Sequence, residues 1–277
     1  MKIERAGTRP PVVDRLIDTL VARCRPLQFF GKARLAELII SRTGKRDALI
    51  FGSWFSLDTS DYLQRHIYAG SFERKETRIV RKLLGPGMTF VDVGANVGYY
   101  TALAAQLVGP TGSVFAFEPS VYAFPRLSKM IETNRLTCAR AIKCALAESA
   151  GERLLYGGVV DEEAADIRTA TMVPHDSPRR ALVGTETLDH MADELNIHHI
   201  DFLKIDVDGL EPMVLQGADG MITHGRISNI MLECAEYWFQ RMNTSTAELL
   251  QHLRAKGYSN IVRVEGSSEF STYLFRR

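Results

Sequence analysis

The stretch Phe90-Val91-Asp92-Val93-Gly94-Ala95-Asn96-Val97-Gly98-Tyr99-Tyr100-Thr101 decides the fold of this chain. Its first residues are typical of a buried strand, its glycines of a tight turn, and its end of the start of a helix. One unit later, the apolar run 113–117 predicts a second strand, which Glu118 closes. A strand, a glycine turn and an acidic residue at the next strand tip are the parts of a nucleoside-binding crevice.

The residues of the turn favour S-adenosylmethionine over a dinucleotide. A dinucleotide site has a glycine in the middle of G-x-G-x-x-G, where the backbone approaches a pyrophosphate, and here that position is Asn96. Asp92 would repel a pyrophosphate, but it can receive an ammonium or sulfonium group. Glu118 can accept hydrogen bonds from two ribose hydroxyls. Gly94 and Gly98 by themselves would suit any tight strand-to-helix turn.

Five ordered blocks of sequence resemble the FkbM family of S-adenosylmethionine-dependent methyltransferases. The blocks are DVGANVGYYT (92–101), AFEP (116–119), TLD (187–189), LKIDVDGLE (203–211) and LQGA (215–218), within a match that runs from about Phe72 to Glu236. The resemblance implies O-methylation, typically of hydroxyls on bacterial sugars, polysaccharides or polyketide-type natural products. Asp208 departs from the family, which more often has glutamate there; the charge is kept and the reach is shorter.

The cofactor site is expected to combine the glycine turn with residues before and after it. Glu73 matches a G-x-[YF]-E run that resembles the family, although a first-turn helix acid is the plainer explanation. Ala145, just after the third strand, would flank the adenine ring by position in the resemblance. The full set of predicted cofactor-binding residues is Glu73, Asp92, Gly94, Asn96, Gly98, Tyr100, Thr101, Glu118, Pro119, Ala145 and Asp206.

Carboxylates at two later strand ends are the predicted catalytic groups. An alcohol must lose a proton as it is methylated, which needs a base or a metal ion. In one mechanism Asp206 or Glu233 is the base, and His175 in a polar loop is a further candidate. In the other, Asp206, Asp208 and Glu233 bind Mg²⁺ or another hard cation. Two structural roles compete with these: Asp206 as a cap at its turn, and Glu233 as a partner of Lys204.

Composition narrows the partners and the compartment. The chain has 277 residues, 45% of them hydrophobic, and its net charge of +1 offers no strong field for nucleic acid or anionic lipid. The four cysteines show no CxxC spacing, and no apolar run reaches the ~18 residues of a membrane span. The first residues contain no apolar signal core. We therefore expect a cytoplasmic protein that has no nucleic-acid partner and no membrane span.

The chain is expected to divide into two parts. Residues 1–71 are predicted to form a mostly helical cap, with helices near 12–24 and 33–40. Residues 72–277 alternate strand and helix, which predicts an α/β Rossmann-like methyltransferase domain: a mostly parallel seven-stranded sheet with helices on both faces. The predicted strands lie at 89–93, 113–117, 140–144, 202–205, 230–232, 259–264 and 272–275. Residues 154–182 are expected to be a long irregular loop at the substrate side or a solvated insertion.

Other functions remain open on the sequence alone. The acceptor is expected to be a small molecule or a glycan, and an N-methyltransferase acting on an amino sugar or another small amine is the nearest alternative. A non-catalytic module that only binds the cofactor is the alternative of another class, and a dehydrogenase is disfavoured by Asn96. The apolar face of the first helix could also support a homodimer.

Overall fold

The computed structural model describes residues 11–25, 27, 32, 34, 40, 44–157, 171–174, 180–267 and 269–277. The chain divides into two compact units. The first comprises residues 1–50 and 54–73, and the second comprises 51–53 and 74–277. Each unit is described by itself below.

The first unit contains both helices and a small sheet. Its elements are α1 (Pro11–Cys24), β1 (Lys45–Ile50), β2 (Ser53–Asp58) and α3 (Tyr62–Ala69), and β1 pairs with β2. Asp61 caps α3 by accepting a hydrogen bond from the Gln64 N–H at 2.8 Å. The part of the chain predicted to be mostly helical thus also contains a small sheet. Most of the helix predicted at 33–40 lies outside the described residues.

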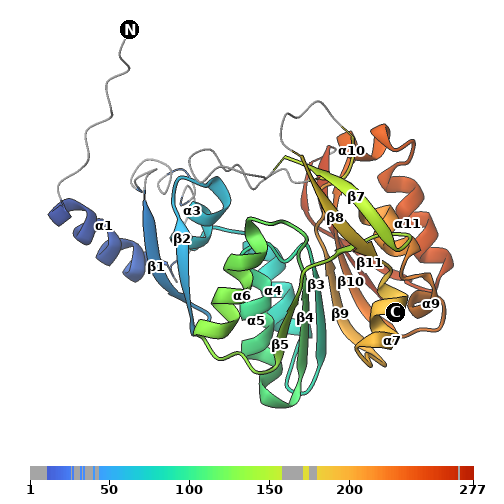
Figure 1. The fold of residues 1–277 in the computed structure, drawn as a ribbon, viewed down its shortest axis with the longest axis horizontal. Coiled ribbons are helices and arrows are strands. Elements are labelled where there is room, and N and C mark those ends of the chain that lie inside the picture. Colours follow the sequence, from blue (N-terminus) through green and yellow to red (C-terminus); the bar gives the residue numbers. More distant parts are fainter. Residues whose placement is uncertain are drawn as a thin grey trace, which may run out of the picture. The chain divides into compact units, whose positions relative to one another are not determined.

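The second unit is built on a seven-stranded sheet with the order β11-β12-β10-β9-β3-β4-β5 (Figure 1). The four pairs from β10 to β5 are parallel, and β12 runs antiparallel to both of its neighbours. The strands are β3 (Thr89–Val93), β4 (Ser113–Phe117), β5 (Ala139–Ile142), β9 (Ile200–Ile205), β10 (Ile227–Ala235), β11 (Asn260–Gly266) and β12 (Phe270–Arg276). The predicted mostly parallel seven-stranded sheet is thus confirmed.

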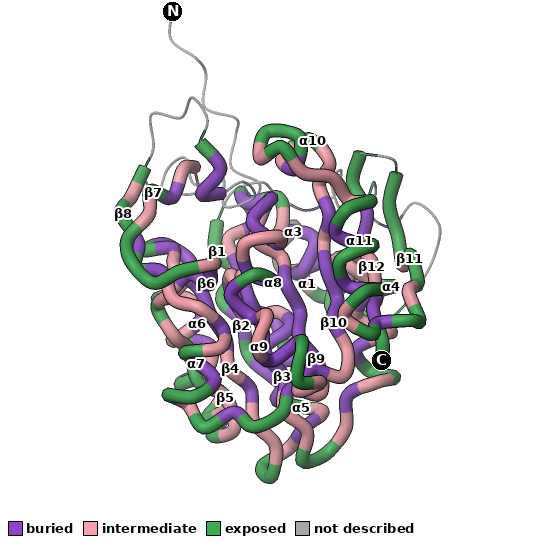
Figure 2. The backbone as a smooth tube through the Cα atoms, turned by 90° about the vertical axis from the view of Figure 1, so that its right-hand side faces the viewer, coloured by how far each residue is buried: buried purple, intermediate pink, exposed green. Residues whose placement is uncertain are grey.

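Helices cover both faces of this sheet. On one side lie α4 (Arg74–Leu83), α5 (Tyr99–Val108) and α6 (Ala123–Thr133); on the other lie α7 (Leu188–Glu194), α9 (Asp219–Thr223) and α11 (Thr246–Ala255) (Figure 1). Between two layers of helices the central strands are buried on both faces, which explains their continuous apolar sequences (Figure 2). Phe90 of β3 stacks on Phe202 of β9 with ring centroids 5.6 Å apart.

The structure corrects the predicted irregular loop. Its two ends are strands, β7 (Gly151–Tyr156) and β8 (Arg180–Glu186), which form a three-stranded sheet with the short β6 (Ala145–Leu146). The alternating exposure along β8 marks a strand with one face on the core and one in solvent. The remaining short elements are a 3-10 turn at Gly109–Thr111, α8 (Glu211–Gln216) and α10 (Glu236–Arg241).

Among the described residues, no helix combines the length and the apolar character that crossing a membrane requires.

Candidate cofactor and catalytic site

The glycine turn after β3 joins three strand ends. The Gly94 and Ala95 N–H groups both donate to the Phe117 carbonyl at the end of β4, at 3.0 and 3.1 Å. Gly94 has φ +81°, and a Cβ atom there would lie 1.9 Å from the backbone oxygen of Asp206, at the end of β9. Only glycine fits such a close approach. The turn therefore fixes Asp206 relative to the end of β4.

Glu118 is the polar centre of the turn. Its Oε2 accepts the Asn96 N–H at 2.8 Å, and its Oε1 accepts the Ser120 N–H at 2.9 Å. Each carboxylate oxygen keeps one acceptor position, so the two can still bind a pair of hydroxyls. Burial raises the pKa of Glu118 to about 7, although the two N–H donors oppose this shift. The arrangement suits the ribose role that the sequence predicts.

Asp92 lies below the turn and is 1% exposed. Its Oδ2 accepts a hydrogen bond from the Thr101 hydroxyl of α5 at 2.7 Å. Its Oδ1 is buried and has no hydrogen-bond partner among the described residues. A buried carboxylate oxygen in this state is costly unless a ligand pairs with it. Thr101 therefore positions Asp92. The contacts that the sequence predicts between these two residues and the cofactor remain predictions.

A cavity of about 610 Å³, its open mouth included, lies over the carboxyl ends of β3, β4 and β9. Carboxyl ends of parallel strands are where ligands bind in this architecture. Six predicted cofactor residues line it: Gly94, Asn96, Glu118, Pro119, Ala145 and Asp206. Gly98 and Tyr100 do not; Gly98, with φ +91°, is the left-handed residue that begins α5.

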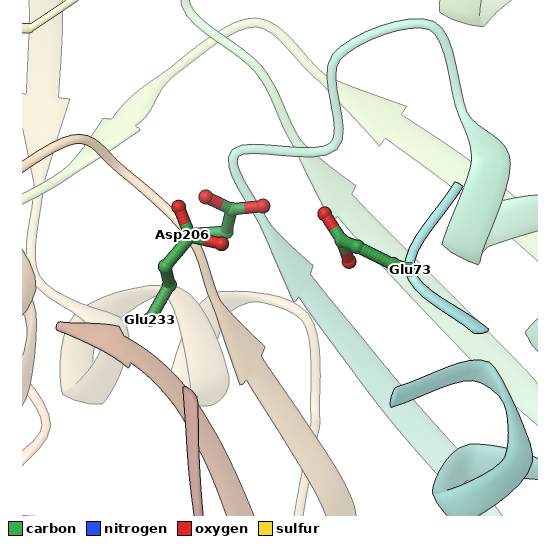
Figure 3. A group of neighbouring side chains, drawn as sticks. All are labelled: Glu73, Asp206 and Glu233. Atoms are coloured by element: carbon green, nitrogen blue, oxygen red, sulfur yellow. The ribbon is translucent and has the colours of Figure 1, made fainter. Parts of the chain in front are cut away.

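The predicted catalytic carboxylates of Asp206 and Glu233 come together. Oxygen atoms of the two lie within 4.8 Å, and Figure 3 shows the carboxylates approaching each other. Glu233 lies within β10 rather than at its end, because antiparallel pairing with β12 extends the strand to Ala235. Lys204 donates to Asp206 Oδ2 at 2.6 Å, a contact that the sequence did not reveal.

Asp208 does not join this pair. It lines the cavity with φ +50°, and no group of three potential metal ligands among the described residues includes it. Burial and the nearby Asp206 and Glu211 raise its pKa well above the usual value. Glu211 shapes this turn by accepting the Val207 N–H at 3.2 Å. The three-carboxylate metal set predicted from the sequence is therefore not assembled.

Two further predicted residues cannot be placed in the site. His175 lies outside the described residues. Glu73 belongs to the first unit, with φ +31°, so its proposed contact with the cofactor stays a prediction.

Residues that the sequence did not single out complete one wall of the cavity. Leu155 of β7 and Met172 line it, next to an isolated bridge between Tyr156 and Thr171. The Thr171 hydroxyl also donates to the Asp208 carbonyl at 2.6 Å. Leu155 and Met172 lie in a stretch of sequence without a periodic apolar pattern. Their place in the cavity wall therefore becomes visible only from the long-range pairing in the structure.

The comparisons with known proteins identify the family. The model of the methyltransferase FkbM domain matches residues 92–259, which include the glycine turn, Glu118, Asp206 and Glu233. The chain belongs to the FkbM methyltransferase family. This confirms the resemblance drawn from the five sequence blocks. It also places the cavity and the carboxylate pair within the part of the chain that defines the family.

The similar proteins are methyltransferases by name. Methyltransferase sdnD of Sordaria araneosa is 30% identical over 155 residues, which cover 47% of this chain and 60% of that protein. Ribosomal RNA large subunit methyltransferase E of Nitrosomonas eutropha is 33% identical over 93 residues, 34% of this chain and 39% of that protein. A crystal structure of methyltransferase FkbM from Methylobacillus flagellatus matches with 14% identity and a TM-score of 0.48, covering 94% of this chain and 60% of that one. The chain thus spans less than two thirds of these relatives' lengths.

The raised pKa of Glu118 predicts a pH-dependent cofactor affinity in this FkbM-family protein. Below about pH 7 the buried carboxyl is protonated, and above it the carboxylate can accept both ribose hydroxyls. We expect affinity for S-adenosylhomocysteine to rise as pH increases through about 7 and then to level off. Calorimetric titration between pH 5.5 and 8.5 measures this. In Glu118→Ala the affinity should be weaker by about 1 to 3 kcal/mol at pH 8, and the rise of affinity with pH should disappear. If the pH dependence of the affinity is unchanged in this variant, Glu118 does not belong to the site.

Proposed function

We propose that this FkbM-family protein is an S-adenosylmethionine-dependent O-methyltransferase that acts on a hydroxyl of a bacterial sugar, glycan or natural product. The observation that carries the proposal is the proximity of Asp206 and Glu233 beside a cavity that already contains Gly94, Asn96 and Glu118. Methylation of a hydroxyl requires a cofactor crevice and a group that takes the hydroxyl proton, and either carboxylate can serve as that group.

The residues of the cavity and of the strand beneath it fit the cofactor. Glu118 offers two fixed acceptor oxygens for the ribose. Asp92, buried below the glycine turn, would offer its unpartnered Oδ1 to an ammonium group. Ala145 and Leu146 give the cavity an apolar wall suited to an adenine ring. When bound, S-adenosylmethionine would supply a methyl group on a sulfonium, which is an excellent leaving group.

The chain's own contribution is alignment and proton removal. Asp206 is held by Lys204 on one oxygen, and a hydroxyl between Asp206 and Glu233 would have a carboxylate acceptor within reach on either side. Holding the acceptor in line with the reacting methyl group is worth up to ~7 to 11 kcal/mol in favourable systems. As the hydroxyl oxygen attacks, its proton passes to one of these carboxylates.

The experiment that tests the function starts with the cofactor. Calorimetric titration with S-adenosylhomocysteine, and with NAD as the control, should show micromolar binding of the former alone. Methyl transfer is then measured with sugar, glycan and natural-product hydroxyl acceptors, and with matched amino sugars. Methylation of hydroxyls supports the proposal, whereas exclusive methylation of amines would favour the N-methyltransferase. Cofactor binding without transfer to any acceptor would favour the non-catalytic module.

Metal removal separates the two mechanisms. We expect dialysis against EDTA to leave turnover within about twofold, for two reasons. The Lys204 ammonium already compensates the charge of the Asp206 carboxylate, and Asp208 lies outside the pair formed by Asp206 and Glu233. The control is the same dialysis without chelator. Loss of turnover that added Mg²⁺ restores would show that a cation activates the acceptor.

A further inference from the structure

Lys204 occupies an unusual position in the second unit. It is 5% exposed and is the only buried basic side chain among this unit's described residues. Burial of a cation is expensive unless carboxylates compensate it. Its ammonium donates to Asp206 Oδ2 at 2.6 Å and lies 4.6 Å from the centre of the Tyr100 ring. The group is thus held in place from β9 and from α5.

Lys204 is also the strand neighbour of Asp92. The two residues are Cα partners in the parallel pair of β9 and β3, where adjacent strands run about 4.8 Å apart. Partner residues in such a pair project from the same face of the sheet. Asp92 has one buried oxygen without a hydrogen bond, so the nearby ammonium is its main charge compensation. Lys204 therefore lies between the carboxylate expected to bind the cofactor and the carboxylate expected to act on the acceptor.

We propose that Lys204 is a positioning residue for this site: it keeps the buried Asp92 carboxylate ionised to receive the cofactor's ammonium, and it holds Asp206 at the cavity. The proposal rests on the proposed function, since it assigns a role in cofactor binding. Lys204 affects the cofactor and the acceptor through Asp92 and Asp206.

The surrounding charges set the direction of the test. Burial raises the pKa of Asp92, and Lys204 and Thr101 lower it. The other titratable groups around Lys204 and Asp92 are Glu76 of α4, Glu118 after β4, Tyr100 of α5, Asp206 and Asp208. None of these five is a cation, so the positive charge beside Asp92 comes from Lys204. Its removal should move ionisation of Asp92 to higher pH, so that the cofactor's ammonium loses its partner near neutrality.

The test is calorimetric titration of S-adenosylhomocysteine into the wild type and Lys204→Met between pH 6.5 and 8.5. We expect the variant to bind about tenfold more weakly at pH 7, because the cofactor's ammonium loses a charged hydrogen-bond partner. The deficit relative to the wild type should shrink as pH rises. Taking this ratio at each pH removes the contribution of Glu118. Lys204→Gln, which keeps a donor for Asp206 without the charge, is measured in parallel in case the methionine variant does not fold.

Two further variants show whether Lys204 acts through Asp92. Lys204→Met added to Asp92→Asn should cost little more than Asp92→Asn alone, because an asparagine at this position cannot ionise. Lys204→Arg keeps the positive charge. Its affinity for S-adenosylhomocysteine should depend on pH as that of the wild type does, even if the binding constant is weaker. A loss of affinity in Lys204→Met and Lys204→Gln that is independent of pH and additive with Asp92→Asn would overturn the proposal. Failure of the wild type to bind at any pH would instead refute the proposed function.

Discussion

Gly94→Ala should lower the free energy of unfolding by about 3 kcal/mol and abolish binding of S-adenosylhomocysteine. The added Cβ would lie 1.9 Å from the Asp206 backbone oxygen, so the end of β3 or the end of β9 must move. The φ of +81° adds strain for any residue with a side chain. Both carboxylates that this turn positions, Glu118 and Asp206, would shift with it. Urea unfolding and calorimetric titration measure the two effects.

Gly85→Ala is the matched control for this substitution. A Cβ added at Gly85 would meet no atom within 4 Å, and the residue has no positive φ, so the change in stability should be within about 0.5 kcal/mol. If Gly94→Ala lowers the free energy of unfolding as little as Gly85→Ala does, the turn tolerates a side chain. In that case the close approach of β3 and β9 does not define the site.

Asp206→Asn should reduce turnover by about a hundredfold to ten-thousandfold while it leaves the affinity for S-adenosylhomocysteine within a few-fold. Asparagine has the size of aspartate and can still accept the Lys204 hydrogen bond, but it cannot take a proton from the acceptor. Initial rates on a hydroxyl acceptor and calorimetric titration measure the two quantities separately.

Two comparisons sharpen this prediction. Asp193→Asn removes an exposed carboxylate on α7 and should leave the rate unchanged. Glu233→Gln removes the second carboxylate of the pair, and the variant with the larger loss of turnover identifies the principal proton acceptor. Full activity of Asp206→Asn would exclude this residue from proton transfer.

The central strands could be predicted from the sequence because burial on both faces makes them continuous apolar runs. The predicted strands 89–93 and 113–117 coincide with β3 and β4. The end of β10 could not be predicted, since its last residues are fixed by pairing with β12 rather than by local sequence. The strands β7 and β8 were missed for the same reason, because their pairing is visible only in three dimensions.

The candidate site shows the same division. Residues fixed by local backbone chemistry, such as Gly94 and Glu118, followed from the motif and line the cavity. The sequence suggests Glu233 as the partner of Lys204, whereas in the structure Lys204 donates to Asp206. A lysine within an apolar strand signals a buried charge, but its partner depends on the neighbouring strand. The spacing of the sequence places Asp208 beside Asp206, yet no group of three potential metal ligands among the described residues includes Asp208.

The bridge between Tyr156 and Thr171 ties the cavity wall to the turn that follows β9. The Thr171 hydroxyl donates to the Asp208 carbonyl, so the wall formed by Leu155 and Met172 is fastened directly to the turn that begins with Asp206. Thr171→Val, which removes that hydroxyl at nearly constant volume, should therefore loosen two walls of the cavity at once.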